Sequence, residues 1–280
     1  MQSDPIHYGL FITLSLTYTM IEKDTWQVAA FYRFVGLSEL ASLADELSHL
    51  GHKHGLCGTI LLAPEGINAT VAARPELLQD WLRTFTAMAP FHGLQPKFST
   101  CARAPFPRFK VRLKKEIVTL RQPQVDPVNH VGEYVDAADW DALVNDPEVL
   151  VIDTRNDYEV RFGRFKGAID PGTDHFNQFP AFVRQHLADA KQRKVALYCT
   201  GGIRCEKATA FMKQEGFEQV YHLKGGILQY LEDKGADQEK TWVGDCFVFD
   251  HRVALDARLE PAAWIPDAAT NQPAPVSGDQ

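Results

Sequence analysis

The sequence Val195-Ala-Leu-Tyr-Cys-Thr-Gly-Gly-Ile-Arg-Cys-Glu-Lys-Ala-Thr-Ala-Phe-Met-Lys213 places a strand, a loop and a helix in immediate succession. Residues 195–198 are apolar and predict a buried strand. Residues 205–213 predict a helix, because their apolar side chains recur on one face. Alternation of strands and helices indicates an α/β unit with a parallel sheet. The loop at residues 199–204 follows the carboxyl end of the strand, where such sheets place their functional sites.

The loop from Cys199 to Arg204 combines a thiol with features that favour an anion. Its two glycines let backbone N–H groups turn inward toward the sulfur. The start of the helix adds the positive end of its dipole, and Arg204 adds a full charge. Because these effects lower a thiol pKa, we predict that Cys199 is a nucleophile or persulfide carrier and that Arg204 stabilises its thiolate. A buried structural cysteine beside a glycine turn is the alternative. The predicted active-site loop consists of Thr200, Gly201, Gly202 and Ile203.

The spacing of this loop separates two kinds of anion site. Four residues lie between Cys199 and Arg204, one fewer than in the Cys-x5-Arg loop of tyrosine phosphatases. A phosphate needs the larger ring of amides, whereas the tighter loop suits a sulfur-sized group on the cysteine, such as a persulfide. Phosphatase activity is therefore not expected.

The composition is that of a soluble globular protein with room for two domains. The 280 residues carry a formal net charge of −7, which argues against indiscriminate nucleic-acid binding. The five cysteines form no Cys-x-x-Cys pair and no zinc pattern, so we expect a reducing cytoplasm and no metal site. The apolar stretch 9–20 is shorter than the about 20 residues that span a bilayer and lacks the marks of a secretory signal. We therefore expect no membrane association.

The predicted elements divide the chain into five segments. Residues 25–121 read as strand, helix, strand, strand, helix and strand, which predicts a ferredoxin-like α+β domain. Residues 122–133 contain two prolines and a glycine and are predicted as a linker. Residues 134–252 alternate strands with helices, which predicts an α/β domain with a parallel sheet and a short extension. Residues 1–24 are predicted to be an N-terminal extension, and residues 253–280 a disordered tail.

Positive charge is concentrated between residues 97 and 121, where eight basic side chains are opposed only by Glu116. Phe98, Phe106 and Phe109 interleave with this basic strip. Such a pattern is typical of a surface that tracks phosphates and stacks on RNA bases. An edge strand protected by lysines is the alternative. The candidate RNA-binding residues are Arg103, Arg108, Lys110, Arg112 and Lys114, together with Arg164 and Lys166 of the second domain.

Several motifs are similar to known families. Across residues 130–235 the chain resembles the rhodanese domain, through Asp153-Thr-Arg155, Glu159, Gly163, Gly167-Ala-Ile169, the Cys199 loop and Leu223-x-Gly-Gly. A closer resemblance, over residues 26–252, is to the oxygen-dependent tRNA uridine hydroxylase family. It rests on Leu62-Ala-Pro-Glu-Gly-Ile-Asn68, Cys199-Thr-Gly-Gly-Ile-Arg-Cys-Glu-Lys207 and Trp242-x-Gly-x-Cys-Phe-Val-Phe-Asp250. The chain departs from these families in two ways. Many relatives in the hydroxylase family carry a cysteine-rich segment after the Phe-Val-Phe-Asp element, whereas no cysteine follows Cys246 here. Residues 163–166 are Gly-Arg-Phe-Lys, where generic sulfurtransferases usually show Gly-His-Ile-Pro.

The resemblance implies a fold and an activity. It implies an acylphosphatase-like N-terminal domain followed by a rhodanese domain. It also implies hydroxylation of the wobble uridine of tRNA at C5, with Cys199 as the reactive group and the anticodon stem-loop as the bound partner. Molecular oxygen would be the co-substrate, and no cofactor is evident from the sequence. Two alternatives are a sulfurtransferase that carries persulfide sulfur on Cys199 and a non-catalytic redox or RNA-binding module.

Five residues near the loop have two interpretations each. Asp153, Arg155 and Glu159 either form an ion pair and turn that stiffen the rim of the site or take part directly in catalysis. Cys205 either resolves an oxidised loop cysteine through a disulfide or packs inertly at the helix start. Lys207 either faces a substrate phosphate or faces solvent.

Overall fold

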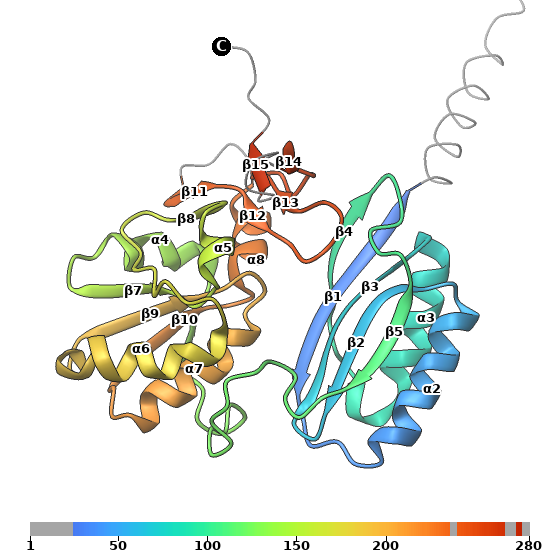
Figure 1. The fold of residues 1–280 in the computed structure, drawn as a ribbon, viewed down its shortest axis with the longest axis horizontal. Coiled ribbons are helices and arrows are strands. Elements are labelled where there is room, and N and C mark those ends of the chain that lie inside the picture. Colours follow the sequence, from blue (N-terminus) through green and yellow to red (C-terminus); the bar gives the residue numbers. More distant parts are fainter. Residues whose placement is uncertain (1–24, 236–239, 267–272, 276–280) are drawn as a thin grey trace, which may run out of the picture.

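The computed structural model describes residues 25–235, 240–266 and 273–275, which form two domains side by side (Figure 1). The predicted N-terminal extension, residues 1–24, lies outside the described residues. The predicted fold classes are confirmed, because a five-stranded α+β domain precedes a domain with a four-stranded parallel sheet. No helix in the described part of the chain is long and apolar enough to cross a bilayer.

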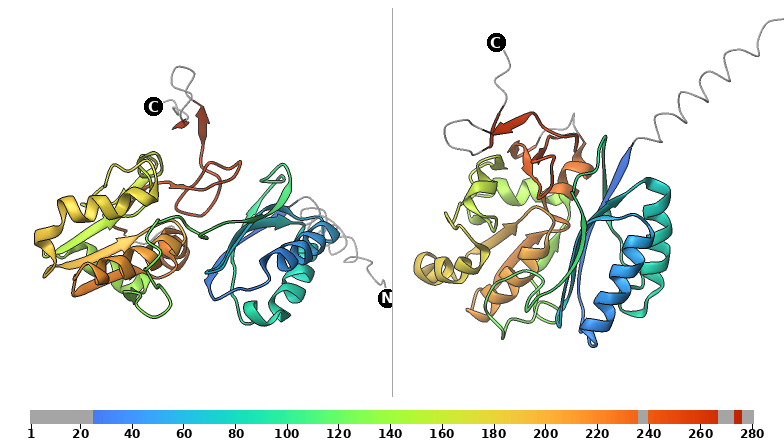
Figure 2. Two further views of the ribbon diagram at one scale, coloured as in Figure 1. Left: turned by 60° about the horizontal axis from the view of Figure 1, so that its bottom comes forward. Right: turned by 45° about the vertical axis from the view of Figure 1, so that its right-hand side comes forward.

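The first domain packs two helices on one face of its sheet, the face turned away from the second domain (Figures 1 and 2). The strand order is β4-β1-β3-β2-β5, and only the β2–β5 pair is parallel. The strands are β1 (Trp26–Phe34), β2 (Cys57–Ala63), β3 (Gly66–Ala73), β4 (Lys97–Cys101) and β5 (Phe109–Leu113). The helices are α2 (Leu40–Lys53) and α3 (Pro75–Ala87), followed by the 3-10 turn Ala89–Phe91.

Alternation along β1 determines which face of this sheet the helices cover. Ala29 and Phe31 pack into the core with Leu47 of α2 and Trp81 of α3. Successive side chains of a strand point to opposite faces, so Tyr32 lies on the other face. That open face of the sheet has no covering helix and is turned toward the second domain (Figure 1).

The second domain is built on the parallel sheet β6-β10-β9-β7. These strands are β6 (Glu133–Val135), β7 (Val149–Asp153), β9 (Lys194–Tyr198) and β10 (Gln219–Leu223). The helices are α4 (Ala137–Asn145), α5 (Asp157–Val160), α6 (Phe179–His186), α7 (Ile203–Gln214) and α8 (Gly226–Lys234), with 3-10 turns at Phe176–Gln178 and Ala188–Ala190. The short strands β8 (Gly163–Phe165) and β11 (Trp242–Gly244) pair with each other.

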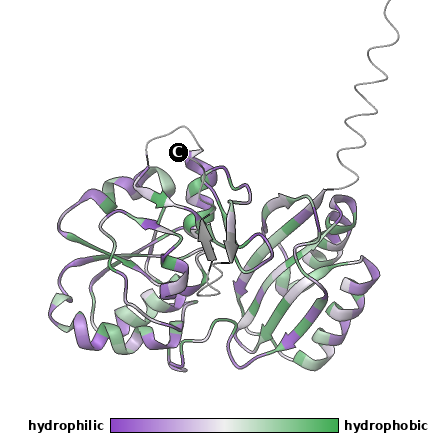
Figure 3. Cartoon of the chain, turned by 45° about the horizontal axis from the view of Figure 1, so that its top comes forward, coloured by the Kyte–Doolittle hydropathy of each residue, from purple (hydrophilic) through white to green (hydrophobic). Residues whose placement is uncertain are grey.

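The strand before the reactive loop is buried on both faces. Val195 and Leu197 pack in the core that contains α6 and α7, whereas Ala196 and Tyr198 pack in the core that contains α4 and α8. This explains why the strand is a continuous apolar run rather than an alternating one. Figure 3 shows the same concentration of hydrophobic residues in the strands.

Two predicted segments differ from expectation. The linker predicted at residues 122–133 is not free of the second domain, because Val125 is buried in its core together with Leu120. The tail predicted to be disordered from residue 253 contains the strand β13 (Ala254–Leu255), which pairs with β12 (Cys246–Phe247). Its two apolar side chains are buried, which explains why this part is ordered. Beyond it lie β14 (Trp264–Pro266) and β15 (Pro273–Pro275).

The C-terminal extension touches both domains. Trp242 pairs with Phe165 of the second domain. The Arg252 guanidinium donates to Ser99 Oγ of β4 at 2.7 Å, and the His251 N–H donates to the Pro105 carbonyl at 3.2 Å. The extension therefore bridges the top of the two domains (Figure 1).

Candidate active site at the domain interface

Cys199 lies at the carboxyl end of β9, with no exposed surface. The Gly202 N–H donates to its sulfur at 3.1 Å. Gly202 is the N-cap of α7 and has φ 99°, a left-handed conformation that favours glycine. The local sequence thus aims an amide and the positive end of a 12-residue helix at the sulfur.

The pKa of Cys199 is lowered despite its burial. Burial alone raises the pKa of the thiol, but a hydrogen bond from the Cys205 thiol, the charge of Arg204 and the backbone N–H groups of both residues outweigh it. The pKa of Cys205 is raised well above its usual range by burial and by the neighbouring Cys199. These opposite directions favour the thiolate on Cys199 and the protonated thiol on Cys205.

The Arg204 guanidinium makes its hydrogen bonds to Glu159 rather than to the sulfur. It donates to both Glu159 oxygens, at 2.6 and 2.7 Å, and lies 3.5 Å from Thr200 Oγ1. Burial raises the pKa of Glu159, but the charge and hydrogen bonds of Arg204 and the Asn156 N–H bring it below its usual range. Arg204 therefore acts on the thiolate through its charge while Glu159 fixes its position.

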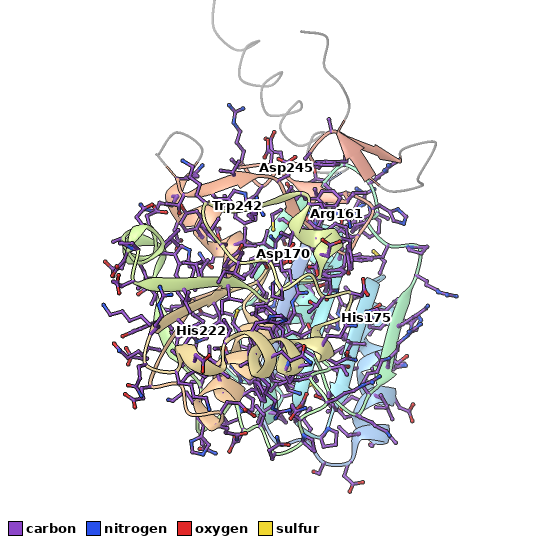
Figure 4. The ribbon with its side chains drawn as sticks, turned by 60° about the vertical axis from the view of Figure 1, so that its left-hand side comes forward. Arg161, Asp170, His175, His222, Trp242 and Asp245 are labelled. Carbon is purple, nitrogen blue, oxygen red and sulfur yellow. The ribbon has the colours of Figure 1, made fainter. Side chains whose placement is uncertain are left out.

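Asp153 and Arg155 form a buried ion pair, which is the first of the two interpretations given for them. The Arg155 guanidinium donates to Asp153 at 2.6 Å and to the carbonyls of Glu159 and Gly163 at 3.2 and 2.6 Å. It also lies 5.2 Å from the ring centre of Trp242, which lies in the upper part of Figure 4. These contacts fix the segment that carries Glu159, and neither Asp153 nor Arg155 lines the cleft described next.

A cleft of about 1000 Å³ lies between the two domains, and Cys199 is part of its wall. The open face of the first sheet forms one side, including Ala30, Tyr32 and Thr70. The Cys199 loop forms the other side, together with His175, which is labelled in Figure 4. The loop of the reactive cysteine in one domain thus faces the bare sheet of the other across the cleft, while the Cys199 side chain itself is enclosed.

Sequence reasoning named Phe98 and Phe106, which line this cleft, but missed Tyr32, which lines it and also contacts the second domain. The Tyr32 hydroxyl donates to Glu206 Oε1 at 2.9 Å, and the Tyr134 hydroxyl donates to Glu206 Oε2 at 2.7 Å. Lys97, counted only as part of the basic strip, also lines the cleft. The one available signal was Tyr32 itself, a side chain with a hydroxyl group on the face of β1 opposite to Phe31.

Lys207 faces neither substrate nor solvent, so both of its predicted interpretations are wrong. Its ammonium is buried and lies 2.8 Å from Glu65 and 2.7 Å from Glu116. It also donates to the Val118 carbonyl at 3.0 Å. Glu65 occupies the tight turn between β2 and β3, which closes at Gly66. Lys207 therefore joins the second domain to the first.

The candidate RNA-binding residues lie in three places. Lys110 and Arg112 of the edge strand β5 pair with Thr59 and Leu61, which line the cleft, so they lie on the same open face. The loop that precedes β5 carries Arg103 and Arg108, and the residue after β5 is Lys114; all three are exposed. The second domain carries Arg164 in β8 and Lys166 just after it, both exposed. Lys110 and Arg112 thus lie on the open face beside the cleft, but none of these seven candidate residues lines the cleft itself.

The two domains match known families. Residues 26–117 match the UPF0176 acylphosphatase-like domain, and residues 136–233 match the rhodanese-like domain. The fold and the cysteine site therefore define a rhodanese-domain protein with an acylphosphatase-like first domain. Among the residues that the structure describes, no group of three or more His, Cys, Asp or Glu side chains is placed to hold a metal ion.

Three similar proteins are all named tRNA uridine(34) hydroxylase. The tRNA uridine(34) hydroxylase of Sinorhizobium fredii is 54% identical over 246 residues, which cover 88% of this chain and 78% of the relative. That of Agrobacterium fabrum is 52% identical over 228 residues, covering 81% and 72%. That of Synechocystis sp. is 48% identical over 235 residues, covering 84% of both. The chain belongs to the tRNA uridine(34) hydroxylase family.

Proposed function

We propose that this protein hydroxylates uridine 34 of tRNA at C5, in the cytoplasm, with molecular oxygen as co-substrate. The observation that carries the proposal is the cleft in which the Cys199 thiolate faces an open sheet flanked by cations. Its volume of about 1000 Å³ suits a nucleotide turned out of an RNA loop. The names of its relatives agree with this substrate.

In the proposed reaction the sulfur of Cys199 attacks C6 of the uracil ring. The new S–C6 bond makes C5 nucleophilic, and C5 takes up one oxygen atom. The proton on C5 then leaves and the S–C6 bond breaks, which restores the thiolate and the aromatic ring. The second oxygen atom of O₂ leaves as water, which takes up two protons and two electrons from a two-electron donor such as a dithiol.

Each loop residue has a role in this scheme. The Gly202 N–H and the helix start hold the sulfur as an anion before attack and after release. Arg204 adds positive charge beside it, and Glu159 holds the guanidinium in place. Lys110 and Arg112, at the edge of the cleft, contact phosphates on either side of the uridine.

The test is nucleoside analysis of tRNA from a strain that lacks the gene. Return of the wild-type gene restores 5-hydroxyuridine at position 34, whereas the Cys199→Ser variant does not. Unchanged tRNA nucleosides in all three strains would refute the proposal. Transfer of sulfur from thiosulfate to cyanide by the purified protein, with no change in tRNA, would instead favour the sulfurtransferase alternative.

A further inference from the structure

Lys97 reaches from the first domain into the loops around Cys199. It is the first residue of β4, and its ammonium donates to the Gly225 carbonyl and, at 3.3 Å, to the Gly201 carbonyl. Gly201 belongs to the Cys199 loop, and Gly225 is the N-cap of α8. One side chain of the first domain therefore holds both loops of the second.

These two loops are also tied to each other behind the sulfur. The N–H of Ile227, in the first turn of α8, donates to the Cys199 carbonyl at 3.0 Å, and the Leu228 N–H donates to the Thr200 carbonyl at 3.1 Å. Gly225 has φ 72°, and a Cβ there would lie 2.9 Å from the Lys97 nitrogen. The backbone at 225 thus leaves room for the ammonium to approach.

The Lys97 ammonium is charged near neutral pH, although it is largely enclosed. Burial lowers its pKa to about 8, partly opposed by Cys199 and by Glu232 and Asp233 of α8. A lysine ammonium has three N–H donors, and the two carbonyls use two of them. The third donor remains for the cleft that the side chain lines.

We propose that Lys97 is a positioning residue of the Cys199 site, which fixes the two loops around the sulfur and places a second positive charge beside the thiolate. Arg204 supplies the first charge from within the second domain, and Lys97 supplies the other from outside it. Full reactivity of Cys199 therefore requires the first domain to be docked. The benefit for uridine hydroxylation rests on the proposed function, whereas the effect on the thiol does not.

The test is the pH dependence of Cys199 alkylation by iodoacetamide in the full-length protein, followed by mass spectrometry of the modified peptide. Replacement of Lys97 by methionine raises the midpoint by about one pH unit, so that alkylation below the midpoint slows about tenfold. The rates of the two proteins converge at high pH, where the thiol ionises without help. Lys97→Arg keeps the charge, so its alkylation midpoint stays close to that of the wild-type protein.

Lys53→Met is the matched control, because it removes an exposed lysine of the same domain that lies in α2 and does not line the cleft. It leaves the alkylation midpoint unchanged. A wild-type midpoint in Lys97→Met protein with a wild-type urea unfolding curve would overturn the proposal. A shift in Lys97→Arg as large as in Lys97→Met would also overturn it, because charge would then not be the cause. Loss of hydroxylation with normal midpoints in every variant would count against this proposal and leave the proposed function standing.

Discussion

Replacement of Arg204 by methionine is expected to lower the free energy of unfolding of the whole protein, because it breaks a buried ion pair with Glu159. The guanidinium and the Glu159 carboxylate are both buried and share hydrogen bonds of 2.6 and 2.7 Å. Removal of one partner leaves the other as an uncompensated buried charge, which costs about 3–5 kcal/mol. Arg204→Met and Glu159→Gln are each expected to lower the free energy of unfolding by about that amount.

The double variant separates this pairing from other effects. With both charges gone, no unpaired ion remains, so its loss of stability is expected to be about equal to one single loss. The coupling energy would then equal one single loss, about 3–5 kcal/mol, well above the about 0.5 kcal/mol within which independent sites add. Urea unfolding at pH 7 of wild type, both single variants and the double variant measures it. Additive losses would refute the account of Arg204 as a residue held by Glu159.

The same pair makes stability depend on pH. The pKa of Glu159 is lower in the folded protein than its usual value, mainly because Arg204 outweighs the effect of burial. Its stabilising contribution is therefore complete above about pH 4.3, the usual glutamate pKa, and disappears as the pH falls through the lower folded value. The difference in stability between wild type and Glu159→Gln is expected to shrink over that acidic range. A constant difference from pH 7 to pH 3 would contradict the assignment.

Three further changes test other parts of the site. Cys199→Ser is expected to leave no 5-hydroxyuridine in tRNA by mass spectrometry, while urea unfolding changes by less than about 1.5 kcal/mol. Lys207→Met, which breaks the buried ion pairs between the domains, is expected to cost about 2 kcal/mol in the same assay, against under about 1 kcal/mol for Lys224→Met, which removes an exposed ion pair; equal losses would contradict the role. Lys110→Glu with Arg112→Glu is expected to weaken tRNA binding and to lower its salt slope by roughly 0.7–0.9 for each phosphate that the variant no longer binds; unchanged binding would move the RNA surface elsewhere.

The sequence was most informative where the structure depends on residues that are close together in the chain. The strand at 195–198 and the helix after it were predicted because burial and periodicity act over a few residues. The loop was interpreted as a setting for a thiolate, and the structure places the Gly202 N–H and the start of α7 at the neighbouring sulfur. The tail was predicted from composition, which did not reveal the pairing of Leu255 with Cys246.

The parts that sequence reasoning missed depend on interactions between distant residues. Tyr32 and Glu206 are separated by 174 positions, and nothing near either residue indicates the other. Lys207 was expected to face substrate or solvent. Its partners, Glu65 and Glu116, belong to the other domain, so the sequence around Lys207 does not reveal them. Lys97 was counted as one cation among eight, and only the docking of the domains distinguishes it from the rest.

The most direct test of the central claim is the source of the hydroxyl oxygen. A deletion strain that carries a returned copy of the wild-type gene is grown under ¹⁸O₂, and the masses of its tRNA nucleosides are measured by mass spectrometry. We expect 5-hydroxyuridine two mass units heavier than under ¹⁶O₂, and none from the Cys199→Ser strain. Unlabelled 5-hydroxyuridine under ¹⁸O₂, or equal amounts from the serine variant, would contradict a cysteine-dependent hydroxylation by molecular oxygen.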